Sequence, residues 1–194
     1  MPLLTTQSVR SYGFGSAAES LGRFNSISTQ IASGSATTIT FSSIPTIYRY
    51  LQLHSYFALT NNDTDITIRF NGDSGTNYTK SQIYNTGSQS GGATQGTTSA
   101  RGLTSSAGPV WYGNSTSGFI STISFIYDAN ATDKVKTQNT LTGGSVDSAG
   151  TSQGVFNRMG LWNNSSDAIT SMVLTSTGGN IISGSHFALY GIKG

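Results

Sequence analysis

The sequence predicts an all-β fold, an antiparallel sandwich or barrel, from three observations. Apolar and polar residues alternate with a period of two in about ten short segments, which is the repeat of a half-buried strand. Turns rich in Gly, Asn and Ser separate these segments. Helical spacing is confined to residues 16–22, where a single turn is compatible with the sequence. Aromatic residues make up 10% of the chain and fall in the strand-like segments, which argues against disorder.

The first half of the chain contains the clearest strands. Segment 65–70 places Ile66, Ile68 and Phe70 on one face and polar residues on the other, so we expect these three side chains to point into a core. Segment 51–59 carries its apolar residues at odd positions, which predicts the same for Leu51, Leu53, Phe57 and Leu59. Further strands are expected at 37–41 and 78–84.

The second half of the chain is less regular. Segment 119–127 is partly apolar on both faces. This pattern is typical of a central strand, or of a strand whose outer face meets another subunit. The remaining strands are expected at 109–112, 133–140, 154–162, 168–175 and 186–192.

The domain organisation follows from where the alternation begins. Residues 1–36 are polar apart from isolated aromatic residues and cannot bury enough apolar area alone. We therefore predict an extended or weakly structured N-terminal arm that lies along another surface. Residues 37–194 then form one β-sandwich domain, which is long enough for a core. Segments 86–108 and 141–154 indicate long loops within it.

Composition and charge exclude several classes of function. Only 9% of residues are charged, and the net charge is +2 with scattered basic residues. Binding to nucleic acid needs clustered Lys and Arg, so we expect no nucleic-acid partner. Cysteine is absent, which excludes disulfides and thiolate chemistry. The sequence shows no signal peptide or membrane span, so we expect synthesis in the cytoplasm and no membrane partner.

Side chains suited to catalysis are scarce. The chain has one Glu, Glu19, in its polar N-terminal part, and its Asp residues lie mostly in turns, where Asp commonly bonds its own backbone. The two histidines, His54 and His186, fall inside expected strands, and no Gly-x-Ser-x-Gly motif is present. We expect the histidines to face solvent or a neighbouring chain. The sequence therefore predicts no catalytic residue and no enzymatic activity.

Segment 71–78 has some features of a calcium loop. Asn71, Asp73 and Asn77 offer oxygen atoms at close spacing, and hard cations bind oxygen ligands. A single carboxylate would bind calcium poorly, however, and no closing Glu follows. The alternative is a tight turn between the flanking strands, with glycines at positive φ. We favour the turn and expect neither a metal nor a cofactor.

Several motifs carry a resemblance to a known family. Positions 185–193 read S-H-F-A-L-Y-G-I-K, positions 41–45 read F-S-S-I-P, 50–53 read Y-L-Q-L and 68–78 read I-R-F-N-G-D-S-G-T-N-Y. These motifs resemble those of a family of virion structural proteins of tailed bacteriophages, and together they cover most of residues 37–194. The resemblance implies a jelly-roll-like antiparallel β-sandwich and, from similar proteins, a threefold homo-oligomer.

The resemblance leaves more than one function open. The first is a non-enzymatic decoration or cement protein on the outer surface of the virion, bridging and stabilising subunits of the capsid shell. Its partners would be the major capsid protein or tail proteins, together with copies of itself, with a trimer favoured. The alternative is a tail fibre, or a tail-attached module that binds a receptor or carbohydrate. A third hypothesis, a depolymerase or wall hydrolase, is disfavoured by the scarcity of Glu, His and Cys.

Aromatic residues are the candidates for contacts between subunits or with a partner, because Tyr and Trp are enriched at interfaces. Such residues could equally stack on sugar rings or fill the core. The six residues that we select as candidate contacts are Tyr12, Phe14, Tyr56, Trp111, Tyr112 and Trp162.

Overall fold

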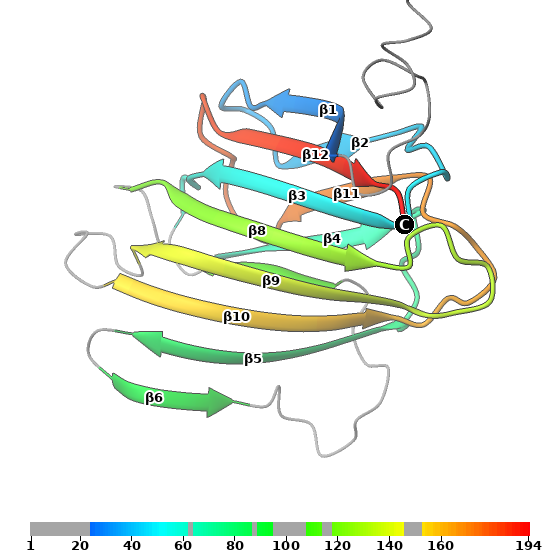
Figure 1. Ribbon diagram of the computed structural model, residues 1–194. Coiled ribbons are helices and arrows are strands. Elements are labelled where there is room, and N and C mark those ends of the chain that lie inside the picture. The colour runs from blue at the N-terminus through cyan, green and yellow to red at the C-terminus, as the bar shows by residue number, and fades with distance from the viewer. Residues whose placement is uncertain (1–23, 62–63, 87–88, 95–107, 114–117, 146–152) are drawn as a thin grey trace, which may run out of the picture.

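The computed structural model describes residues 24–61, 64–86, 89–94, 108–113, 118–145 and 153–194. Within these ranges the chain forms twelve strands and no helix. Every pairing between the strands is antiparallel, and the pairings divide them into two sheets (Figure 1). The all-β antiparallel fold predicted from the sequence is confirmed.

The two sheets differ in size. The larger sheet has eight strands, in the spatial order β1 (Phe24–Ile31), β12 (His186–Ile192), β3 (Tyr50–Phe57), β8 (Ile120–Tyr127), β9 (Lys136–Ser145), β10 (Gln153–Trp162), β5 (Tyr78–Thr86) and β6 (Gln89–Thr94). The smaller sheet has four, in the order β2 (Thr38–Phe41), β11 (Met172–Ser176), β4 (Thr64–Phe70) and β7 (Gly108–Gly113).

The chain alternates between the two sheets as it advances. It places β2 in the smaller sheet, β3 in the larger, β4 in the smaller and β5 in the larger. The same exchange recurs from β7 to β8 and from β11 to β12. A chain that wraps in this way around a two-layered body is characteristic of a jelly roll, so the sandwich is jelly-roll-like.

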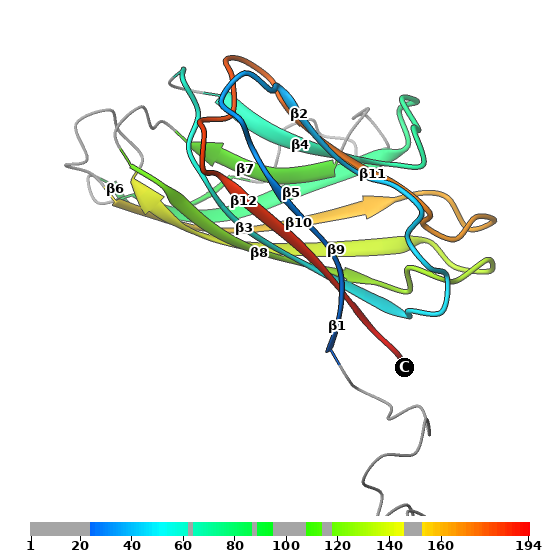
Figure 2. The ribbon, with the colours of Figure 1, turned by 90° about the horizontal axis from the view of Figure 1, so that it is seen from above.

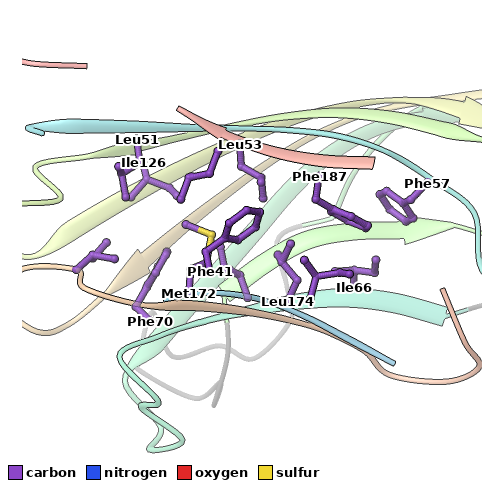
Figure 3. Close-up of a cluster of buried hydrophobic side chains, with 14 of the residues drawn as sticks. Phe41, Leu51, Leu53, Phe57, Ile66, Phe70, Ile126, Met172, Leu174 and Phe187 are labelled. Atoms are coloured by element: carbon purple, nitrogen blue, oxygen red, sulfur yellow. The ribbon is translucent and has the colours of Figure 1, made fainter. Parts of the chain in front are cut away.

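The core lies between the two layers, which are seen edge-on in Figure 2. Figure 3 shows Phe41, Met172 and Leu174 of the smaller sheet facing Leu53 and Phe187 of the larger sheet. All five are at most 1% exposed, and burying a side chain of this size stabilises the fold by roughly 1.5–3 kcal/mol. The residues that alternation assigned to the core are all buried, namely Leu51, Leu53, Phe57, Leu59, Ile66, Ile68 and Phe70.

The C-terminal motif packs β12 between β1 and β3. The Ser185 hydroxyl donates a hydrogen bond to the carbonyl of Ile182 (2.6 Å) and accepts one from the backbone N–H of Ala58 (3.3 Å). Gly191 lies beneath the ring of Tyr48, where a Cβ atom would come within 2.3 Å of the ring. Both positions therefore have a structural reason for the residue that they hold.

Two segments that we expected to lie outside the strands are part of the larger sheet. Residues 24–31 of the predicted arm form β1, which pairs with β12, and residues 89–94 of the predicted loop 86–108 form β6, which pairs with β5. Both segments are mainly polar, and strand pairing through the backbone does not need apolar side chains. The sandwich thus includes residues from 24 onward. Residues 1–23, with the expected turn at 16–22, lie outside the described part of the chain.

Two strand boundaries also differ from the prediction. β9 begins at 136 and continues to 145, whereas the sequence predicted 133–140, so the predicted loop 141–154 is shorter than expected. β11 begins at 172, although 168–175 was expected. The residues before it are used differently, because Ile169 donates its backbone N–H to the carbonyl of Ala129 in another loop (2.7 Å).

Candidate interaction surface

The face of the larger sheet that points away from the smaller sheet is the candidate functional surface. It is turned toward the viewer in Figure 1, and the smaller sheet lies behind it. Pairing registers place its residues in four rows across seven strands. We call it the outer face and define it as Phe24, Ser26, Thr29 and Ile31 of β1, the even residues 186–192 of β12 and 50–56 of β3, and the odd residues 121–127 of β8, 137–143 of β9, 155–161 of β10 and 79–83 of β5.

The outer face carries no charged residue and combines large apolar side chains with uncharged polar ones. None of the residues that define it is Asp, Glu, Lys or Arg. Large hydrophobic side chains on it are well exposed, with Val155 at 66%, Ile31 at 60% and Leu141 at 46%. Contiguous exposed apolar patches on a soluble protein mark sites of interaction, and loss of charged residues is typical of the centre of an interface. The remaining large exposed apolar residues of the outer face are Phe24, Tyr56, Ile83, Tyr127 and Met159.

Aromatic rings occupy both ends of the outer face. At one end, Tyr56 stacks on the neighbouring Phe119, with ring centroids 4.7 Å apart and planes inclined by 18°. At the other end, Tyr50 and Tyr127 meet edge to face at 6.0 Å. These contacts hold the rings in place while Tyr56 remains 53% exposed, so the surface presents pre-ordered rings to a partner.

Both histidines lie on the outer face. His186 is exposed, and the ring of His54 lies 5.1 Å from the ring of Tyr190. Because the outer face includes no carboxylate, neither histidine has an Asp or Glu beside it on this surface. The arrangement offers shape, apolar area and hydroxyl groups, which are the means of binding a protein surface.

Four polar atoms at the outer face are enclosed without a hydrogen-bond partner among the described residues. They are Oε1 of Gln52, Nε2 of His54, Oδ1 of Asn139 and Oδ1 of Asn157. A buried polar atom without a partner destabilises the protein by about 1–3 kcal/mol. Their side chains stand on the outer face, but the atoms themselves are covered, so a group from outside reaches them only when these side chains turn.

The inner face of the same sheet is polar where β9 crosses it. Lys136, Gln138, Thr140 and Thr142 point inward and are all buried. Lys136 donates from Nζ to the carbonyl of Asn164 (2.8 Å), and burial lowers the pKa of this lysine. The Thr140 hydroxyl lies 2.8 Å from the hydroxyl of Ser124 and accepts a hydrogen bond from Nε2 of Gln138 (3.0 Å).

The six contact residues expected from the sequence separate into four groups. Tyr56 lies on the outer face and is exposed. Trp111 and Tyr112 lie in β7, opposite Ile66 and Asp65 of β4, and their side chains are not described. Tyr12 and Phe14 fall outside the described residues.

Trp162 does not provide a surface contact, contrary to our expectation. It is 1% exposed and packs between Phe70 and Tyr78, with ring centroids at 5.5 and 6.4 Å. Its indole N–H donates to Oδ2 of Asp73 (2.7 Å). Side chains alternate between the two faces along β10, and Trp162 is one of those that point inward. The sequence alone did not show which of the two sets of β10 residues faces the core.

Segment 71–77 is a connection that carries the chain from β4 in one sheet to β5 in the other. Asn71 and Gly72 adopt positive φ values of 51° and 71°. The oxygen atoms that suggested calcium are used by the fold, because Asn71 Oδ1 accepts from the backbone N–H of Thr170 (2.8 Å) and Asp73 accepts from Trp162. In the part of the chain that the structure describes, no three His, Asp or Glu side chains gather closely enough to hold a metal ion.

Hydrogen bonds dominate the environment of Asp73. Its Oδ1 accepts from the backbone N–H of Gly75 (2.9 Å), and Asn77 donates to its Oδ2 (3.0 Å) beside Trp162. Burial acts to raise the pKa of the Asp73 carboxyl, but these donors outweigh burial and hold the pKa below its ordinary value. Asp73 therefore ties the connection between the sheets to the end of β10.

The outer-face residues that sequence analysis missed are aliphatic. Leu141 stands in a polar segment, Val155 and Met159 stand in one that is apolar at both parities, and strand pairing places all three on the same face. A usable signal is present in 154–162, where odd and even positions both hold large apolar residues. Such two-sided character was predicted only for 119–127.

Comparisons with known proteins do not identify a relative. No family model, no curated protein and no solved structure matches this chain. A search of the described residues for a helix with the length and hydropathy to cross a membrane found none. The outer face and the sequence motifs are therefore the features that bear on function.

Proposed function

We propose that this chain is a non-enzymatic structural protein of a tailed-bacteriophage particle, acting as a decoration or cement protein on the outside of the capsid. The outer face carries the proposal, because a broad, uncharged and apolar sheet surface is suited to binding other protein surfaces. The motifs at 41–45, 50–53, 68–78 and 185–193 supply the link to phage particles.

The proposed mechanism is mechanical. Each copy would bridge neighbouring shell subunits and bury apolar area, which contributes roughly 25 cal/mol per Å² before the costs of association. Many copies acting together would brace the shell against the pressure of packaged DNA. The protein would be made in the host cytoplasm and join the virion surface as a homo-oligomer, for which the sequence resemblance favours a trimer.

Particles that lack the protein provide the test. We expect them to release DNA at a lower temperature and after milder osmotic shock than complete particles, and we expect added purified protein to restore both properties. The control is a particle preparation treated with an unrelated protein of similar size. Equal resistance of particles with and without the protein would show that it does not act as a cement.

A tail-attached module is the second candidate, because exposed rings such as those of Tyr56, Phe119 and Tyr127 are also able to stack on sugars. The number of copies per particle separates the two locations. Hundreds of copies favour the capsid, and about a dozen favour the tail. Binding to host glycans on an array, lost when Tyr56 is replaced by Ala, would favour the carbohydrate-binding version.

A further inference from the structure

We propose that the outer face is the surface through which copies of this chain bind one another. The inference deepens the proposed function. It rests on that function only for the statement that the oligomer is part of a phage particle. Its evidence is the geometry and chemistry of the outer face, and the occupant to which it commits is a second copy of the same chain.

The absence of charge on the outer face favours a like surface as the partner. A strongly acidic or basic partner would find no complementary group among the residues that define this face. The same face of another copy meets it without repulsion between like charges, and the net charge of the chain is only +2. Such a pairing is isologous, which is the commonest form of self-association, and it gives a dimer in place of the trimer that the sequence resemblance implies.

The size of the outer face fits this occupant. Seven strands about 4.8 Å apart and seven residues at about 3.3 Å each span roughly 35 by 23 Å, or roughly 800 Å². A stable interface of standard size buries about 800 Å² on each partner. Two sheets also pack well face to face, since side chains from the facing surfaces interdigitate at a spacing of about 10 Å.

The outer face carries hydrogen-bonding groups of both kinds. Gln52, Asn139 and Asn157 each hold an oxygen with no described partner on the outer face. The same face carries tyrosine hydroxyls, at Tyr50 and Tyr56 among others, and serine and threonine hydroxyls. Donors and acceptors thus occur on one surface, which is what self-complementarity requires.

The first experiment measures the mass of the full chain in solution over a range of concentrations, by sedimentation or light scattering. We expect a dimer that dissociates on dilution. Leu141→Lys and Val155→Lys, which place a charge on the outer face, should weaken association by about 30-fold or more. Ile47→Lys is the matched control, because Ile47 is 57% exposed in the loop before β3 and lies off the outer face, so it should associate like the unaltered protein.

The second experiment uses the absence of cysteine from the chain. Tyr56→Cys, Leu141→Cys and Met159→Cys place one thiol each at different points of the outer face, and Ile47→Cys is the control. Oxidation should link copies at one or more of the three face positions, because a disulfide needs Cα atoms roughly 4.4–6.8 Å apart. No linkage is expected at position 47.

The outcomes are clear-cut. A chain that stays monomeric at the highest concentration tested overturns the inference, as does association that Ile47→Lys weakens and the two face variants do not. Linkage at Ile47→Cys and at none of the face positions overturns it as well. The proposed function fails separately, if particles lacking the protein resist heat and osmotic shock unchanged, because that assay is independent of self-association in solution.

Discussion

Where β9 crosses the larger sheet, its inward side chains are polar and an outward one, Leu141, is apolar. This is the reverse of the usual distribution, in which apolar side chains face the core. The inward residues of β9 are Lys136, Gln138, Thr140 and Thr142, and they are all buried, whereas Leu141 on the opposite side is 46% exposed. The polar inward side is covered by the chain itself, since β7 lies against β9 and β10. The apolar outward side has no cover from the described residues. The described residues of one copy therefore leave the outer face uncovered, which is why we propose that a second copy covers it.

The largest effect on stability is expected for a side chain on the inner, core-facing side of the larger sheet. Phe187→Ala removes a fully buried ring that stacks on Phe57 at 5.6 Å, and we expect a loss of about 4 kcal/mol in the free energy of unfolding. Val155→Ala on the outer face should cost less than about 0.5 kcal/mol in the dissociated chain. Urea unfolding at low protein concentration measures both. Similar losses for the two variants would contradict the distinction between the faces.

Glycines on opposite faces of the larger sheet offer the next test. Gly191→Ala drives a methyl group into the ring of Tyr48 on the inner side, so we expect a loss of about 3 kcal/mol and a lower melting temperature. Gly143 lies on the outer face, and no atom lies within 4 Å of the position that an added methyl group would occupy. Gly143→Ala is therefore the matched control and should be nearly neutral. Thermal unfolding followed by circular dichroism compares them.

Asp73 links the two sheets at one end, and its effect should depend on pH. Its folded-state pKa lies below its ordinary value, so its contribution is present above the unfolded-state pKa of about 4 and is lost as pH falls through the folded-state pKa. Asp73→Asn should therefore cost about 2 kcal/mol at neutral pH and progressively less below about pH 4. Urea unfolding across this pH range measures the difference.

The control for this prediction is Asp133→Asn, because the side chain of Asp133 is 74% exposed and forms only a long ion pair with Lys134 (3.9 Å). That change should leave stability within about 0.5 kcal/mol at every pH tested. A difference between Asp73→Asn and the unaltered protein that stays constant from neutral to acid pH would contradict the role assigned to the ionised carboxylate.

The smallest effect concerns the polar inner side of β9. Thr140→Val removes an acceptor for Gln138 and a partner for Ser124, and we expect a loss of about 1 kcal/mol. Adding Ser124→Ala should cost little more, because the remaining unpaired hydroxyl is then removed as well. A double-mutant cycle measures this coupling, and strictly additive losses would show that the two hydroxyls do not interact.

Much of the fold was predictable where alternation is strong. The core positions of β3 and β4 were identified because one parity is apolar and the other is polar. In β9 the inward parity is polar, so periodicity alone does not indicate which side is covered. β1 and β6 were missed because edge strands form through the backbone, with little demand on their side chains.

The candidate surface was predictable only in part. Tyr56 was selected as an aromatic residue, and 119–127 was recognised as two-sided. Trp162 was assigned to a contact because its residue type is common at interfaces, yet its partner Asp73 lies far away in sequence. Leu141 and Val155 share a face with residues of β3 and β12 only because strands that are distant in the sequence pair with one another. The pattern within a single segment does not show such pairing.

The position of β12 has a consequence for synthesis of the protein. β12 lies between β1 and β3 in the larger sheet, and Phe24 of β1 pairs with Ile192 of β12. β12 therefore emerges from the ribosome long after both of its neighbours. Folding that depends on such distant pairings is slow, and an incomplete chain has no finished sheet. The outer face is therefore complete only after residues 186–192 have been translated, and until then β1 has no partner in the sheet and β3 keeps one unpaired edge.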